Sequence, residues 1–97
     1  MATWPDPAEL AQVLNVDNVD DWATTLDRVR AAAIAYVKLR VGNWVEGTDT
    51  PDDMLAQAAL RMAEMMAQRP TATAVELGAD PTFNRLMYGH RRRFGVA

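Results

Sequence analysis

The stretch from Pro51 to Arg69, PDDMLAQAALRMAEMMAQR, decides the fold class. Its apolar residues recur every three or four positions, a spacing that places side chains on one face of an α-helix. The apolar face carries Leu55, Ala58, Ala59, Met62, Ala63 and Met66. The opposite, polar face carries Gln57, Arg61, Glu64 and Gln68. The stretch therefore predicts an amphipathic helix packed against a core, and Pro70 is expected to end it.

Helix starts recur along the chain as a short polar residue followed by proline or by acids. Such a residue can accept hydrogen bonds from free backbone N–H groups, proline fits the first helical position, and acids suit the positive end of the helix dipole. This pattern stands at Asp6-Pro7, Asn18-Val19-Asp20-Asp21, Thr50-Pro51 and Asp80-Pro81. It predicts helices over about 7–14, 19–41 and 51–69, and a short last helix that Gly89 stops.

The longest predicted helix, over residues 19–41, has more apolar surface than one contact needs. One stripe carries Trp22, Leu26, Val29, Ala33, Tyr36 and Val37, and a second carries Ile34, Val37 and Val41. We expect this helix to pack against more than one element or against another subunit. Gly42-Asn43 is expected to close it. The stretch 71–79 is expected to be a loop with a short extended piece over 74–77.

These elements predict an all-α fold, a small helical bundle of about four helices with two longer central helices and a flexible basic C-terminal tail. The 97 residues suffice for one domain, divided into a helical domain over 1–89 and a basic tail over 90–97. A core of this size is marginal by itself, so we expect the chain to gain stability from neighbouring subunits.

Charge separates an acidic body from a basic end. All 13 acids lie in residues 1–84, whereas the remainder holds His90 and four arginines without any acid. The run Arg91-Arg92-Arg93-Phe94 has three readings: a solvated tail, a tail that docks on a protein, or an arm that binds nucleic acid. The acidic body would repel DNA, which disfavours the third reading.

The residues that catalytic and metal sites need are sparse. The chain has no cysteine, and its one histidine, His90, stands in the predicted tail. Asp20-Asp21 and Asp52-Asp53 stand at helix starts, where acids act far more often as caps than as metal ligands. The glycines are scattered singly, so no phosphate cradle is expected. We expect no catalytic residue, cofactor or metal, and neither a signal peptide nor a membrane span.

The tryptophans divide into core and surface candidates. Trp22 belongs to an apolar stripe and is expected in the core. Trp4 and Trp44 stand in predicted loops beside proline, asparagine and glycine, where they could anchor a protein interface.

The methionines of the 51–69 helix divide in the same way. Met62 and Met66 lie on the apolar stripe and are expected in the core. Met54 and Met65 lie off it, and the pattern leaves open whether each faces the core or a partner.

The order of these parts carries a family resemblance over nearly the whole chain. The segments concerned are PAELAQVL (7–14), VDDW (19–22), AAAIAYV (31–37), PDDMLAQAALRMA (51–63), DPTFNRLM (80–87) and YGHRRRF (88–94). The chain resembles the small head-tail connector proteins, also called head completion or adaptor proteins, of long-tailed bacteriophages, particularly those infecting actinobacteria. The segment 42–49 departs from the family's pattern.

The resemblance implies a virion structural protein at the head–tail interface, assembled in the host cytoplasm. It implies a homo-oligomeric ring of twelve subunits that sits under the portal protein and holds a tail or stopper protein beneath. Contacts would come from the chain ends and the inter-helix loops, and DNA would pass through the channel without specific binding. The acidic body independently fits such a channel, because like charge repels phosphate.

The residues also leave a second class open, a small helical regulatory or antitoxin-like protein whose basic tail binds DNA or a protein partner. Duplex binding that weakens steeply with salt would favour this class.

Overall fold

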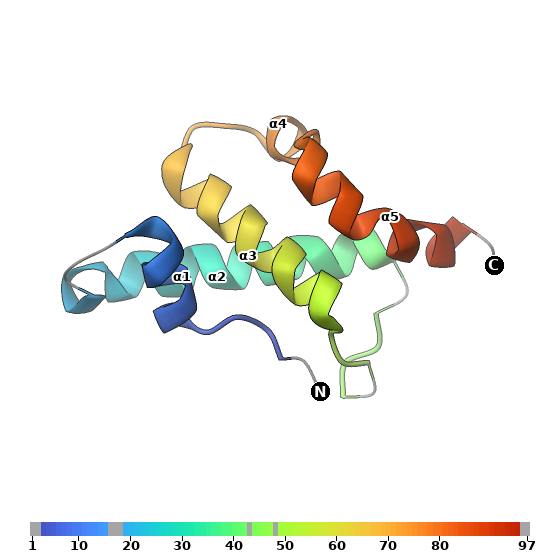
Figure 1. Cartoon of the computed structure of the whole chain (residues 1–97), viewed down its shortest axis with the longest axis horizontal. Helices are drawn as coiled ribbons and strands as arrows, with labels where there is room; N and C mark the ends of the chain where they lie inside the picture. The colour runs from blue at the N-terminus through green and yellow to red at the C-terminus, as the bar shows by residue number, and fades with distance from the viewer. Residues whose placement is uncertain (1–2, 16–18, 43, 48, 96–97) are drawn as a thin grey trace.

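Five helices make up the described part of the chain. The computed structural model describes the backbone of residues 3–15, 19–42, 44–47 and 49–95, and the side chains of 3–15, 22–42, 44–47 and 49–88 (Figure 1). The helices are α1 (Pro7–Leu14), α2 (Val19–Val41), α3 (Asp53–Gln68), α4 (Ala74–Gly78) and α5 (Pro81–Gly95). The chain is 73% helical, and its described residues contain no strand. The predicted all-α class is confirmed.

The long helix α2 is the base on which the other helices pack. Helices α1, α3 and α5 all contact α2, and α3 also contacts α1, α4 and α5. In Figure 1, α3 crosses α2 diagonally, with α1 toward one end of α2 and α5 toward the other. The extents of 45 × 29 × 17 Å describe a slab about two helices thick, given a helix diameter of about 10 Å. The expectation that this helix packs against more than one element is confirmed.

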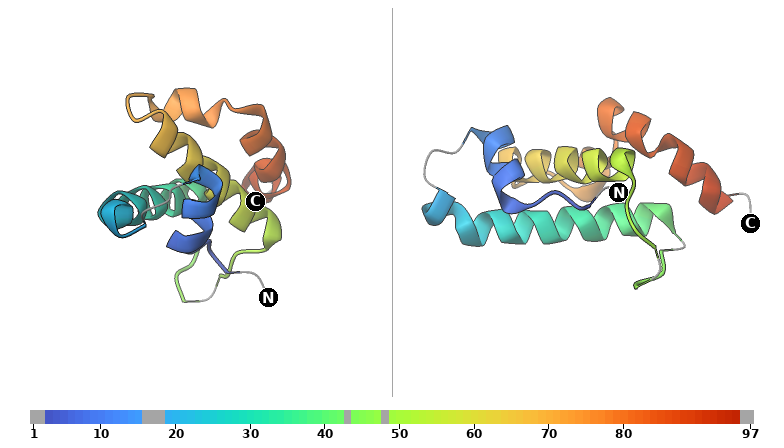
Figure 2. Two further views of the ribbon diagram at one scale, coloured as in Figure 1. Left: turned by 60° about the vertical axis from the view of Figure 1, so that its left-hand side comes forward. Right: turned by 60° about the horizontal axis from the view of Figure 1, so that its bottom comes forward.

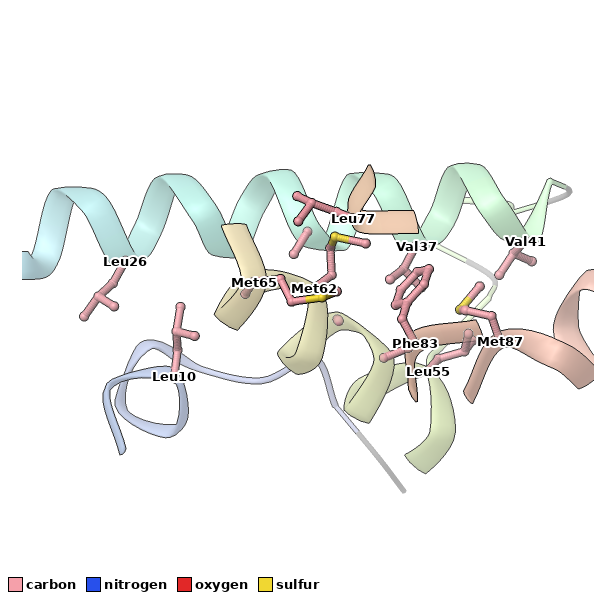
Figure 3. Close-up of a cluster of buried hydrophobic side chains, with 14 of the residues drawn as sticks. Leu10, Leu26, Val37, Val41, Leu55, Met62, Met65, Leu77, Phe83 and Met87 are labelled. Carbon is pink, nitrogen blue, oxygen red and sulfur yellow. The ribbon is translucent and has the colours of Figure 1, made fainter. Parts of the chain in front are cut away.

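The core lies between the stripe of α2 and the apolar faces of α3 and α5. Figure 3 shows Leu26, Val37 and Val41 projecting from α2 into this cluster. Phe83 and Met87 of α5 are both fully buried. Other buried residues of the cluster are Leu10, Ala11, Ala33, Leu55, Ala58, Ala59, Met62, Ala63, Met65 and Leu77. The predicted apolar face of α3 is thus buried from Leu55 to Ala63, and Met66 is partly buried.

Two of the predicted helix starts are confirmed and one is displaced. Asp6 caps α1 with a reciprocal pair of backbone–side-chain bonds to Glu9, and Pro7 takes the first helical position. Pro81 begins α5 directly after Asp80. The third helix begins at Asp53 with Asp52 as its cap, so the prediction of Pro51 as the first helical residue is wrong. Asn18, expected to open α2, lies outside the described residues.

The stretch 71–79 contains a helix that we did not predict. The Thr73 hydroxyl caps α4 by accepting from the Glu76 N–H, and the Glu76 carboxylate accepts from the Thr73 N–H, so two free N–H groups are satisfied at once. The expected extended piece over 74–77 is therefore wrong. The capping pair outweighs the β-propensity of Val75.

Gly89 does not stop the last helix. Helix α5 continues through Gly95, so the backbone of 90–95 is helical, whereas we expected the helix to end at Gly89. A glycine inside a helix costs only about 1 kcal/mol relative to alanine, so it does not by itself end a helix. Gly42, in contrast, follows the last residue of α2 with a φ of 91°, as predicted.

Trp22 is not a core residue, and this prediction is wrong as well. Its side chain is 44% exposed although it continues the stripe of Leu26. Helix α2 has 23 residues and α3 has 16, so α2 is about 10 Å longer at a rise of about 1.5 Å per residue. Figure 1 shows the first turns of α2 extending past α1 and α3, which leaves the Trp22 turn without a cover.

Candidate protein-interaction surfaces

Trp4, Trp44 and Lys38 come together in one cluster, which we call the aromatic clasp. The two indole rings lie 5.4 Å apart and are tilted by 48°. The Lys38 Nζ lies 5.8 Å from the Trp4 ring and 5.6 Å from the Trp44 ring, at cation–π distance from both. Glu46 pairs with the same Nζ at 2.7 Å. The clasp ties the segment before α1 to the connection between α2 and α3.

Both clasp tryptophans were expected to anchor a partner. In the structure their rings contact each other within the chain. Each is partly buried and packs against the hydrophobic core. The part of each ring that remains exposed could still meet a partner, so their interface role stays a prediction.

Two apolar side chains are exposed in the α2–α3 connection and the first turn of α3. Val45 is 53% exposed and Met54 is 47% exposed. The Val45 N–H donates to Asp49 Oδ2 at 2.7 Å, and Asp49 N–H donates back to the Val45 carbonyl at 2.8 Å, which gives this turn a defined shape. We call residues 44–54, apart from residue 48, the loop end.

A second exposed apolar surface lies on α2, opposite the core. Leu39 is 75% exposed. Successive helical residues turn by about 100°, which places Leu39 about 200° from the buried Val37. Ala31, Ala32 and Ala35 are exposed on the same side. We call these four residues the outer face of α2. Ala32, Ala35 and Leu39 are spaced three and four residues apart, so the sequence alone could have predicted this face. We did not predict it, because the opposite stripe of α2 carries more large apolar residues.

The direction of α5 is fixed at its base by Asp80. Its carboxylate accepts from Arg61 Nε at 3.1 Å and from Arg61 Nη2 at 2.9 Å, and it also accepts from the Phe83 N–H at 2.9 Å. The forked contact with Arg61 holds the pKa of Asp80 below its ordinary value, with the Phe83 bond acting in the same direction against partial burial. The same contact raises the pKa of Arg61. The pair joins α3 to the start of α5.

A half-buried polar network also holds α5. Arg40 of α2 donates to Asn84 Oδ1 at 3.1 Å and to the Tyr36 hydroxyl at 3.1 Å. Asn84 Nδ2 donates to the Gly78 carbonyl at 2.9 Å. The Arg40 guanidinium lies 5.5 Å from the centre of the Phe83 ring. These contacts join α2, α4 and α5. The N-terminal part of α5 is therefore held in a fixed orientation relative to α2 and α4.

The predicted basic cluster stands at the far end of this fixed helix. The backbone of Arg91, Arg92, Arg93 and Phe94 continues α5, whereas their side chains lie outside the described ones. Figure 1 and the right-hand view of Figure 2 show this end of α5 projecting past the C-terminal end of α2.

The structure shows which methionines of α3 are buried and which are exposed. Met62 is fully buried as expected, and Met54 is exposed. Met65, which could have faced either way, is buried with 3% exposure, so it faces the core and no partner. Met66 is only partly buried.

A shallow hollow on the far side of α3 does not make a ligand site. Its volume is about 220 Å³, and apolar side chains of α1, α3 and α5, Val13, Leu60 and Leu86, line part of it. Small-molecule pockets usually take about 300–1,000 Å³. Its charged residues, Arg61 and Glu64, already pair with each other at 3.0 Å. The hollow is therefore smaller than an ordinary ligand pocket, and its two charged residues already pair with each other.

The described residues contain neither a cluster of metal ligands nor a membrane-spanning helix. No three acids or histidines among the described side chains gather as metal ligands. No helix in the described ranges is long and apolar enough to cross a membrane.

Comparison with known proteins adds no relative. No protein-family model, no curated protein and no solved structure matches the chain.

Proposed function

We propose that the chain is a head-to-tail adaptor of a long-tailed bacteriophage, which docks as a ring on the portal vertex and joins the DNA-filled head to the tail or to a stopper. The observation that carries the proposal is the outer face of α2. It is an exposed apolar strip on the longest helix, on the side turned away from the chain's own core. Together with the family resemblance, it favours a protein that works by lateral contact with copies of itself.

The position of the strip favours a ring. The strip lies on one side of the slab, whereas α1, α3 and α5 cover the other side of α2. A contact between two different surfaces of the same chain is head-to-tail, and such contacts close into a ring when the rotation between neighbours allows it. A 97-residue chain has a small core and gains from such neighbours.

The charge distribution supports a channel that DNA traverses without being held. The net charge is −3, and the acids are spread over the body. Like-charge repulsion keeps a phosphate backbone from adhering to such a surface. The alternative, a regulatory protein, would instead hold DNA with its basic tail, and that binding would weaken steeply with salt.

The test is attachment to a portal protein encoded beside this chain, measured by co-sedimentation. We expect wild-type protein to sediment with portal rings and Leu39→Glu to lose most of that attachment, because a charge in the strip opposes apolar contact. Val75→Glu is the matched control, since Val75 is 84% exposed and lies on α4, away from the strip. Retained attachment of Leu39→Glu, or no attachment of wild-type protein, would count against the proposal. So would duplex DNA binding that falls steeply with salt.

A further inference from the structure

Two apolar features of the surface lie on opposite sides of the slab. Leu39, the largest residue of the outer face of α2, is 75% exposed. The hollow on the far side of α3 is lined by Leu60 of that helix, by Val13 of α1 and by Leu86 of α5. Leu60 stands two residues before the buried Met62, about 200° away around the helix, so it points away from the core between α3 and α2. The right-hand view of Figure 2 shows α3 on one side of α2. One feature therefore projects from the α2 side of the slab, and the other is a depression on the α3 side.

We propose that the outer face of α2 packs on the hollow of the next copy, with the Leu39 side chain seated between Val13, Leu60 and Leu86. The inference rests on the proposed ring and names the surface that receives the outer face. Because the two surfaces lie on opposite sides of one chain, the contact is head-to-tail, and such contacts close into rings. A two-fold dimer would instead bury the same surface of both copies.

The size and polarity of the hollow suit one apolar side chain. Its volume is about 220 Å³. An apolar cavity of about 150 Å³ holds a molecule of benzene, so the hollow can admit a leucine side chain. The charges of Arg61 and Glu64 compensate each other at 3.0 Å, so no unpaired charge of this pair opposes an apolar group. Ala35 and Ala32 stand one and two turns before Leu39, and their short side chains let the outer face approach the next copy closely.

Charge also matches along the two helices. Arg28 stands three turns before Leu39 on nearly the same line of α2, and Asp53 stands two turns before Leu60 on nearly the same line of α3. Both are exposed, and neither forms an ion pair within the described part of the chain. The two spans are about 16 Å and about 10 Å at a rise of about 1.5 Å per residue, and the length of an arginine side chain covers the difference.

This match gives the contact a direction. With Leu39 in the hollow and α2 running in the same direction as α3 of the next copy, Arg28 reaches the Asp53 carboxylate. Opposite charges across an interface fix its register and disfavour wrong partners. Because both complementary surfaces belong to this chain, the occupant of the hollow is a second copy.

Disulfide trapping tests the contact directly, because the chain has no cysteine. Leu39→Cys and Gln57→Cys are made as separate variants, one of them carrying a mass tag, and mixed under mild oxidation. Gln57 lines the hollow and is exposed, so its replacement should leave the body folded. We expect a disulfide between the two differently sized chains. In the control, Val75→Cys replaces Gln57→Cys; Val75 is exposed on α4 and does not line the hollow, so it should give little of this product.

The double variant Leu39→Cys/Gln57→Cys should give a ladder of linked chains, because each copy both inserts a side chain and receives one. Thr82→Cys, at an exposed position on the α5 side of the hollow, repeats the test independently of Gln57. Circular dichroism of each variant establishes that it is folded. No mixed disulfide above the Val75→Cys control, or a linked dimer without longer products, would overturn the inference.

A second arm exchanges the charges. Arg28→Glu in the Leu39→Cys chain should lower the yield of the mixed disulfide several-fold, because it places an acid opposite Asp53. Asp53→Arg in the Gln57→Cys chain should then restore the yield. A yield that Arg28→Glu leaves unchanged, or that Asp53→Arg does not restore, would contradict the proposed register.

Failure of this contact differs from failure of the adaptor proposal. Wild-type protein that attaches to the portal, while the cysteine variants give no mixed disulfide, leaves the adaptor proposal standing and removes this contact. A ladder of linked chains without any portal attachment keeps the contact and removes the adaptor proposal.

Discussion

Arg61 of α3 holds Asp80 of α5 through two hydrogen bonds, of 2.9 and 3.1 Å, while the same carboxylate caps α5 through the Phe83 N–H. One side chain thus sets where α5 begins and ties that point to α3. Because the basic cluster stands on α5, this pair, together with the Arg40–Asn84 contact, helps to fix the direction of the helix that carries it.

Replacing Asp80 should loosen α5 without unfolding the body. Loss of a helix cap costs about 0.5–2 kcal/mol, and the lost ion pair adds a smaller amount because Arg61 is one-third exposed. We expect Asp80→Ala to lower the free energy of unfolding within that range, measured by urea denaturation at neutral pH. Asp27→Ala, at an exposed position of α2, is the control and should change it little.

The pKa of Asp80 predicts a pH dependence for this effect. Its folded-state pKa lies below the ordinary value, so the carboxylate contributes stability above about pH 4 that is lost as pH falls through the folded pKa. The gap in unfolding free energy between wild-type protein and Asp80→Asn should therefore shrink below pH 4. A gap that stays constant down to pH 2 would mean that the charge of Asp80 contributes nothing.

Two methionines of one helix offer a matched test of the core. Met62 is fully buried and Met54 is 47% exposed. Truncating a buried methionine to alanine costs about 2–5 kcal/mol, whereas exposed substitutions usually change stability by about 0.5 kcal/mol or less. Met62→Ala should therefore unfold at much lower urea than Met54→Ala. Similar midpoints for the two variants would mean that the buried face of α3 is misassigned.

Gly78 lies close to the Tyr36 hydroxyl. A Cβ at residue 78 would collide with the Tyr36 hydroxyl oxygen, so the Tyr36 side chain would have to shift, and it would lie 3.1 Å from Arg40 Nη1. Gly78→Ala should lower stability by about 1–3 kcal/mol, as overpacking does. Removing the hydroxyl with Tyr36→Phe should recover part of the loss in the double variant, measured in a thermodynamic cycle. Strictly additive losses would show that the two residues do not collide.

The segment after Tyr88 should be dispensable for folding and necessary for assembly. Core residues of α5 end at Met87 among the described side chains, so truncation after Tyr88 should leave the melting temperature nearly unchanged. We expect only the helical signal of the removed turns to disappear. Portal co-sedimentation of the same preparation should be lost. A lowered melting temperature with retained attachment would place the interface elsewhere.

Local signals in the sequence were sufficient to predict the positions of most helices. The cap at Asp6, the proline at residue 81 and the repeat of α3 each act within a few residues, so the sequence alone shows them. The cap of α4 is equally local, since Thr73 and Glu76 stand three residues apart, but the valine between them favoured an extended interpretation.

Features that depend on contacts between distant parts of the chain could not be predicted from the sequence. Trp22 has the right spacing for the core, yet no helix reaches far enough to cover it. Arg61 and Asp80 are 19 positions apart and meet only once α3 and α5 are packed. The same holds for Trp4 and Trp44, which were singled out separately and lie against each other.

The most direct measurement of the central claim is electron microscopy of portal rings mixed with this protein. The adaptor account predicts added density on the portal axis, arranged as a closed ring of subunits around an open channel. Portal rings without added density, together with a protein that forms only a two-fold dimer by itself, would contradict it.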